Sequence, residues 1–182
     1  MKISELNLAP YWLKEATVEN EDVSITPWPD EKVIWHSGTW KKGEWKDGIW
    51  KDGVWEGGTW LNGVWEGGIW KKGIWDFGKW YGGVWEYGLW DDGTWLGGTW
   101  KNGTWNNGTW IDGVWESGTW KGGSWRDGIW KNGHWWFGLW KGGLWKGGIW
   151  ESGNWEGGIW EGGTVRISEF EAFHKYSSTP PK

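Results

Sequence analysis

The sequence predicts an all-β repeat protein, and more specifically a solenoid built from five-residue units. Trp occupies every fifth position from Trp35 to Trp160, and Gly does the same from Gly38 to Gly163, two places before each Trp position. The period of five does not match the 3.6 residues of a helical turn, and a Gly in every unit would cost a helix roughly 1 kcal/mol each time. Because the 182 residues include 29 Trp and few aliphatic residues, any core must consist of indole.

Each unit has the pattern of a very short strand followed by a corner. In extended backbone, the Gly and the Trp of a unit share a face, which leaves the residue between them on the opposite face. That middle residue is Thr, Val, Ile or Leu in most units, as expected of strands. The second residue after Trp is Gly, Asn or Asp in 18 of 26 units, and these residues tolerate the positive φ of tight corners.

Two architectures satisfy this pattern. In a solenoid, the units form successive walls and all Trp side chains point inward, where backbone carbonyls beside the Gly positions are the expected partners of the indole N–H groups. In an antiparallel meander, segments such as "WLNGVW" read as hairpins with Asn-Gly turns. A five-residue unit with a two-residue turn leaves three residues for the strand. This odd number counts against the meander, since two-residue turns at both ends of a strand require an even number of strand residues.

The Gly-x-Trp spacing, as in Gly58 and Trp60 or Gly103 and Trp105, resembles that of the pentapeptide-repeat family over residues 36–165. That family pairs Ala or a similar small residue with Leu or Phe, so Gly with Trp is a departure. The resemblance implies a right-handed quadrilateral β-solenoid with four five-residue units per coil. A subperiod of four units is consistent with such a coil. The string "GEWKDG" is also similar to membrane-occupation-and-recognition-nexus repeats, whose longer glycine spacing is absent.

Three segments follow along the chain. Residues 1–32 contain "APYWLKEATVENED", which predicts a short helix with Pro10 in its first turn. Residues 33–164 form the Trp solenoid. Residues 165–182 include "RISEFEAFHKY" and a loose tail. A repeat array needs units that cover its open ends, so we expect both flanks to act as capping segments.

The composition gives no indication of a catalytic site. The chain has no Cys, and His36, His134 and His174 have no metal-like spacing, which predicts isolated surface histidines. Asp91 and Asp92 read as solvated turn residues. We therefore predict a protein that is not an enzyme and that uses no cofactor or metal. The absence of a long apolar run or a signal-like start predicts a cytoplasmic or virion-associated location without membrane insertion.

The outward residues suggest two interaction surfaces. With four units per coil, an apolar band would follow one wall, and such bands usually contact something. Its residues are Ile49, Ile69, Leu89, Ile129 and Ile149. The band predicts a protein partner or self-association, or a cover formed by the N-terminal segment. Aromatic residues outside the repeat places predict a small outer patch made of Trp136, Phe137, Phe77, Tyr81 and Tyr87.

These features predict a non-catalytic structural or interaction module. The chain resembles uncharacterised Trp-rich proteins of phages and environmental microbes, which implies a virion or surface-assembly component. The pentapeptide resemblance implies an alternative, a DNA-mimicking topoisomerase inhibitor. A net charge of −2 over residues 33–164 argues against that alternative and against nucleic-acid binding, as do Lys41, Lys101, Lys121 and Lys141 if one wall carries them. Glycan binding by exposed Trp is a further alternative.

Overall fold

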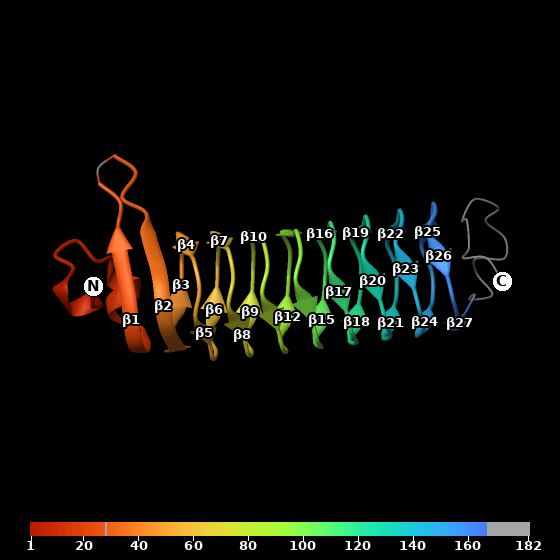
Figure 1. Ribbon diagram of the computed structural model, residues 1–182, viewed down its shortest axis with the longest axis horizontal. Coiled ribbons are helices and arrows are strands. Elements are labelled where there is room, and N and C mark those ends of the chain that lie inside the picture. The colour runs from red at the N-terminus through yellow and green to blue at the C-terminus, as the bar shows by residue number, and fades with distance from the viewer. Residues whose placement is uncertain (28, 167–182) are drawn as a thin grey trace.

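The protein is an elongated all-β solenoid of parallel strands (Figure 1). The computed structural model describes residues 1–27 and 29–166. Every short strand of the repeat pairs in parallel with the strand three units away, so Trp80 lies in register with Trp65 on one side and Trp95 on the other. The predicted parallel β-solenoid is therefore confirmed, and the alternative of an antiparallel meander is wrong.

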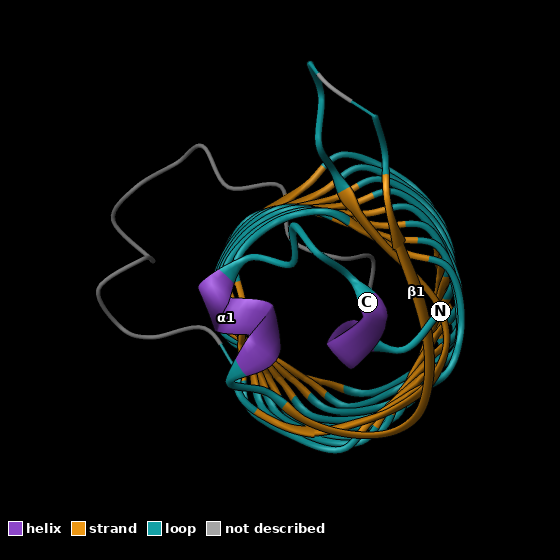
Figure 2. Cartoon of the chain, turned by 90° about the vertical axis from the view of Figure 1, so that its left-hand side faces the viewer, coloured by secondary structure: helices purple, strands orange, loops and turns teal. Residues whose placement is uncertain are grey.

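The number of units per coil differs from the prediction. The register between strands means that three five-residue units, rather than four, complete one coil. Viewed along the rod, the coils superpose as a ring (Figure 2), and the strand pairing divides this ring into three walls. The three indoles of each coil contact one another edge to face, so they fill the smaller interior that three walls enclose. The nine-stranded sheet on one wall defines nine coils, which span about 38 Å at roughly 4.8 Å per strand layer.

The three walls are named here faces A, B and C. Both face A and face B begin in strand β2 (Val33–Lys42), where Trp35 lies on face A and Trp40 lies on face B. Face A continues through β4 (Ile49–Trp50), β7 (Val64–Trp65), β10 (Lys79–Trp80), β13 (Thr94–Trp95), β16 (Thr109–Trp110), β19 (Ser124–Trp125), β22 (Leu139–Trp140) and β25 (Asn154–Trp155). Face B continues through β5 (Val54–Trp55), β8 (Ile69–Trp70), β11 (Val84–Trp85), β14 (Thr99–Trp100), β17 (Val114–Trp115), β20 (Ile129–Trp130), β23 (Leu144–Trp145) and β26 (Ile159–Trp160). Face C consists of β3 (Glu44–Trp45), β6 (Thr59–Trp60), β9 (Ile74–Trp75), β12 (Leu89–Trp90), β15 (Thr104–Trp105), β18 (Thr119–Trp120), β21 (His134–Trp135), β24 (Ile149–Trp150) and β27 (Thr164–Val165).

Backbone hydrogen bonds in every unit join each coil to the one before it. The residue after Trp donates its N–H to the carbonyl of the equivalent Trp in the previous coil, as from Lys101 to Trp85 at 2.8 Å. The residue before Trp donates to the carbonyl of a repeat Gly, as from Thr104 to Gly88 at 2.9 Å. These bonds satisfy the backbone of the very short strands.

The corners depend on the repeat Gly itself. All 26 repeat glycines have positive φ, and at Gly103 φ is +129°. A Cβ at that position would lie 2.4 Å from the carbonyl oxygen of Gly88 in the adjacent coil. The prediction that placed positive φ at the second residue after Trp is wrong, because Asn20 and Glu31 are the non-Gly residues of the described chain with positive φ, and both precede the repeat. At seven of these second positions an Asp or Asn instead accepts a hydrogen bond from the N–H of the next Gly, as Asp112 does from Gly113 at 2.6 Å.

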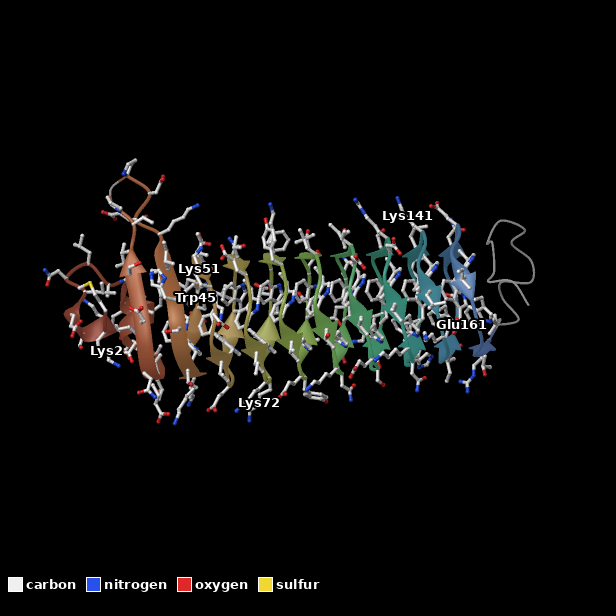
Figure 3. All side chains as sticks on the ribbon, viewed as in Figure 1. Lys2, Trp45, Lys51, Lys72, Lys141 and Glu161 are labelled. Atoms are coloured by element: carbon white, nitrogen blue, oxygen red, sulfur yellow. The ribbon has the colours of Figure 1, made fainter. Side chains whose placement is uncertain are left out.

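The core consists of three columns of stacked indoles. Within a column, rings of successive coils stack with centroids 4.7–5.1 Å apart and interplanar angles of 5–8°. Rings of consecutive units meet edge to face at 5.6–6.0 Å and 70–77°. Figure 3 shows Trp45 inside the coil, whereas Lys72 and Lys141 point away from it. Both arrangements are favoured for aromatic pairs, so each indole gains contacts along the column and across it.

The indole N–H groups find the expected partners in part. Four indoles donate to the carbonyl of the residue just before a repeat Gly in the next coil, at 3.0–3.2 Å. These donors are Trp100, Trp120, Trp130 and Trp135. Among the described residues, 19 other buried indole N–H groups have no hydrogen-bond partner.

The N-terminal segment lies across one open end of the coil (Figure 2). It contains a 3-10 helix η1 (Ile3–Glu5), helix α1 (Tyr11–Lys14) and strand β1 (Thr17–Ile25), which pairs antiparallel with β2. Pro10 lies at the N-cap of α1, close to its predicted place. Trp12 meets Trp45 edge to face at 5.2 Å, so the helix packs on the first coil. Most of the predicted C-terminal cap, residues 167–182, lies outside the described residues.

Candidate interaction surface

The predicted apolar band does not exist as one surface. A step of four units exceeds the three-unit coil by one unit, so each such step moves to the next face. Ile49 lies on face A, Ile69 and Ile129 lie on face B, and Leu89 and Ile149 lie on face C. The prediction that these five residues share a wall is wrong, because it assumed four units per coil.

A different apolar row follows face B. The middle residue of each unit on this face points outward and is aliphatic in all but two of its coils. This face-B row consists of Val54, Ile69, Val84, Val114, Ile129, Leu144 and Ile159, with Thr39 and Thr99 in the remaining two coils. Ile69 is 39% exposed and Ile159 is 64% exposed. The outward middle positions of face A are more polar, since they include Lys79, Ser124 and Asn154.

A row of alternating charges runs beside the face-B row. It is formed by the residue that directly follows each face-B Trp, and we name it the charge row. Its members are Lys41, Glu56, Lys71, Glu86, Lys101, Glu116, Lys131, Lys146 and Glu161. Ion pairs join neighbouring coils at 3.2 Å (Lys71–Glu56), 3.3 Å (Lys101–Glu86) and 3.2 Å (Lys131–Glu116). The charge row therefore has both signs along its length.

The predicted wall of lysines is also absent. Lys41 and Lys101 belong to the charge row, whereas Lys121 follows a Trp of face C and Lys141 follows a Trp of face A. The charge row begins next to strand β1, where Lys41 forms an ion pair with Glu19. This contact raises the pKa of Lys41 above its usual value of 10.5, chiefly because its ammonium donates a hydrogen bond to the Glu19 carboxylate.

The exposed aromatic residues form no single patch. Trp136 and Phe137, which are 51% and 61% exposed, line a shallow hollow of about 490 Å³ together with Lys121 and Ser152. His134 stacks on Trp136 with ring centroids 4.7 Å apart. Of the other predicted members, Phe77 lines a second hollow with Lys79, and Tyr81 and Tyr87 lie on different corners of the coil. The prediction therefore holds for Trp136 and Phe137 as a pair and is wrong for the larger patch.

The two described histidines each have a polar side chain beside them. His36 lies 2.8 Å from the Ser24 hydroxyl, and His134 lies 2.7 Å from a carboxylate oxygen of Glu151. His174 lies outside the described residues.

The two neighbouring aspartates have the expected place at a corner. Asp91 accepts a hydrogen bond from Asn106 at 2.7 Å, and Asp92 accepts one from the backbone of Gly93 at 2.6 Å. Among residues 1–27 and 29–166, no group of three or more potential metal ligands comes together.

No protein-family model, curated protein or solved structure matches the chain. Within the described part of the chain, no helix has the length and apolar character needed to cross a membrane.

Proposed function

We propose that the protein is a rigid, non-catalytic structural or interaction module that associates side by side with a second copy of itself through face B. The observation that carries this proposal is the apolar face-B row beside the charge row. An apolar row along most of the coils is a surface that proteins usually cover. Its neighbouring charges alternate in sign from Lys41 to Lys131, so a second copy that runs antiparallel and is shifted by one coil would set Lys against Glu in most coils. Such a self-complementary surface suits a symmetric pair of copies.

A matched pair of variants tests this proposal. Val114→Lys with Ile129→Lys places two charges in the face-B row. Thr109→Lys with Ser124→Lys places the same charges at equivalent outward positions of the neighbouring face A. We expect sedimentation velocity over a concentration series to show a dimer for the parent and for the face-A variant, and a monomer for the face-B variant. A parent that stays monomeric at all concentrations, or two variants that behave alike, would contradict the proposal.

The setting that fits this module is a virion or a surface assembly, in which rigid rods pack laterally. The resemblance to the pentapeptide-repeat family is weakened by the three-unit coil. The DNA-mimic alternative still predicts inhibition of gyrase, but the alternating charge row is unlike the continuous negative charge of a duplex.

A second candidate function is glycan binding at the hollow lined by Trp136 and Phe137. Exposed indole and phenyl rings offer stacking surfaces, and Lys121 and Ser152 supply polar groups beside them. We expect Trp136→Ala to abolish any binding detected on a glycan array, with Phe77→Ala, at an exposed aromatic of the other hollow, as the control. If no glycan binds the parent, this second function is rejected while self-association is unaffected.

A further inference from the structure

The indole columns are continuous from one end of the repeat to the other. On face A, stacked contacts link the rings from Trp35 to Trp155 without a gap, and the other two faces carry equivalent columns. Edge-to-face contacts at about 6.0 Å connect the columns within each coil, as between Trp100 and Trp105. Every ring between the first and last coils therefore touches an oxidisable aromatic ring above, below and beside it.

The columns are also dry and poor in proton acceptors. The rings from Trp35 to Trp145 are fully buried. Most of their N–H groups have no hydrogen-bond partner among the described residues, and the four named above donate to neutral backbone carbonyls. An indole that loses an electron becomes a strongly acidic radical cation. Inside these columns its N–H proton has no base to receive it, so the positive charge stays on the π-system instead of being trapped by deprotonation.

We propose that the three indole columns conduct one-electron oxidation along the rod. An outer-sphere one-electron oxidant, such as a ruthenium(III) polypyridyl complex, removes one electron from an indole and is reduced to ruthenium(II). The neighbouring indole then gives one electron to that radical cation and becomes the radical cation itself, with no bond made or broken. Repeated transfers move the electron vacancy from coil to coil while each N–H proton stays in place.

The exposed aromatic residues are the surface terminals of this path. Tyr81 directly follows Trp80 of the face-A column and is 48% exposed, and Tyr87 is 59% exposed. When an exposed phenol supplies the electron, its proton passes to water, and the vacancy ends as a neutral tyrosyl radical. Trp136, next to Trp135 of the face-C column, can end the path in the same way by losing its N–H proton to solvent.

The absence of Cys allows a specific test on the full chain. Glu156→Cys places one attachment point for a ruthenium photo-oxidant beside Trp155, five coils from Trp80 on the same face. Tyr11→Phe and Tyr176→Phe, present in all variants, leave Tyr81 and Tyr87 as the tyrosines of the chain. After flash photolysis with an external quencher, we expect a transient tyrosyl absorption that reports arrival at Tyr81 or Tyr87.

A block variant and a matched control establish the route. Phe is much harder to oxidise than Trp, so the change to Phe at Trp110, Trp115 and Trp120 interrupts all three columns in one coil between the label and Tyr81. The same change at Trp50, Trp55 and Trp60 interrupts a coil beyond Tyr81. We expect tyrosyl formation to slow by about tenfold or more in the block variant, which corresponds to at least about 1.4 kcal/mol on the barrier, and to be unchanged in the control. Equal rates in the two variants, or no tyrosyl signal in the parent, would overturn the proposal.

A label series keeps the proposal testable even if the block variant fails to fold. Cys at Arg126, Lys141 or Glu156 places the same oxidant three, four or five coils from Trp80, always on face A. Stepwise transfer predicts a rate that falls only weakly along this series. A steep exponential fall would show a single long-range step and would refute conduction by the columns.

Discussion

At the scale of single residues, the repeat depends on two residues with different structural roles, Gly and Trp. Trp fills the interior, and the repeat Gly turns the corner with a backbone conformation that other residues adopt only under strain. A Cβ at Gly58, where φ is +120°, would lie 2.2 Å from the carbonyl oxygen of Gly43. At the adjacent Gly57, the nearest atom would be 3.7 Å away. Two neighbouring glycines of one unit therefore have different roles.

This difference predicts opposite effects of the same substitution. We expect Gly58→Ala to destabilise the fold by more than about 1–3 kcal/mol, because a contact with the backbone of the preceding coil adds to the strain of positive φ. Gly57→Ala should be neutral or stabilising by up to about 1 kcal/mol, since it restricts the unfolded chain. Urea unfolding monitored by Trp fluorescence measures both. A Gly58→Ala variant that is as stable as the parent would show that the positive φ of Gly58 is not required.

At the scale of elements, strand β1 secures the first coil through its antiparallel pairing with β2 and through the pair between Glu19 and Lys41. The pKa of Lys41 is raised in the folded protein, so this contact stabilises the fold fully below pH 10.5 and is lost as the pH rises through the higher folded value. We expect Glu19→Gln to lower the melting temperature slightly at pH 8. The difference from the parent should vanish in strongly alkaline solution. A difference that does not change with pH would mean that the ion pair does not contribute.

The sequence was sufficient to predict the strands, the inward Trp and the parallel solenoid, because periodicity of this kind reports directly on which residues share a face. It was insufficient for the coil, because Thr, Val and Ile recur in the middle position of every face and also give apparent columns at steps of four units. A stronger signal was present in the charges. At steps of three units, the charges of the charge row alternate in sign from Lys41 to Lys131. Such alternation favours a three-unit coil, because oppositely charged neighbours in adjacent strands stabilise their pairing. The face-B row was missed for the same reason, since its residues become neighbours only when the coil has three units.

At the scale of the whole molecule, the register of the coil decides which distant residues become neighbours, and engineered disulfides test it directly. Thr99 and Val114 pair across adjacent strands of face B, where strand spacing is about 4.8 Å and within the reach of a disulfide. A four-unit coil would instead bring Thr99 next to Thr119, which here lies on face C.

With Cys at 99 and 114, we expect rapid oxidation to an intramolecular disulfide and a gain in stability of up to about 3 kcal/mol from closing the loop between them. With Cys at 99 and 119, we expect free thiols under the same conditions. Because the natural chain has no Cys, mass spectrometry after thiol alkylation reports each outcome without interference. A disulfide in the second variant and none in the first would replace the three-unit coil by a four-unit coil, and the face-B row and the charge row would then no longer be continuous surfaces.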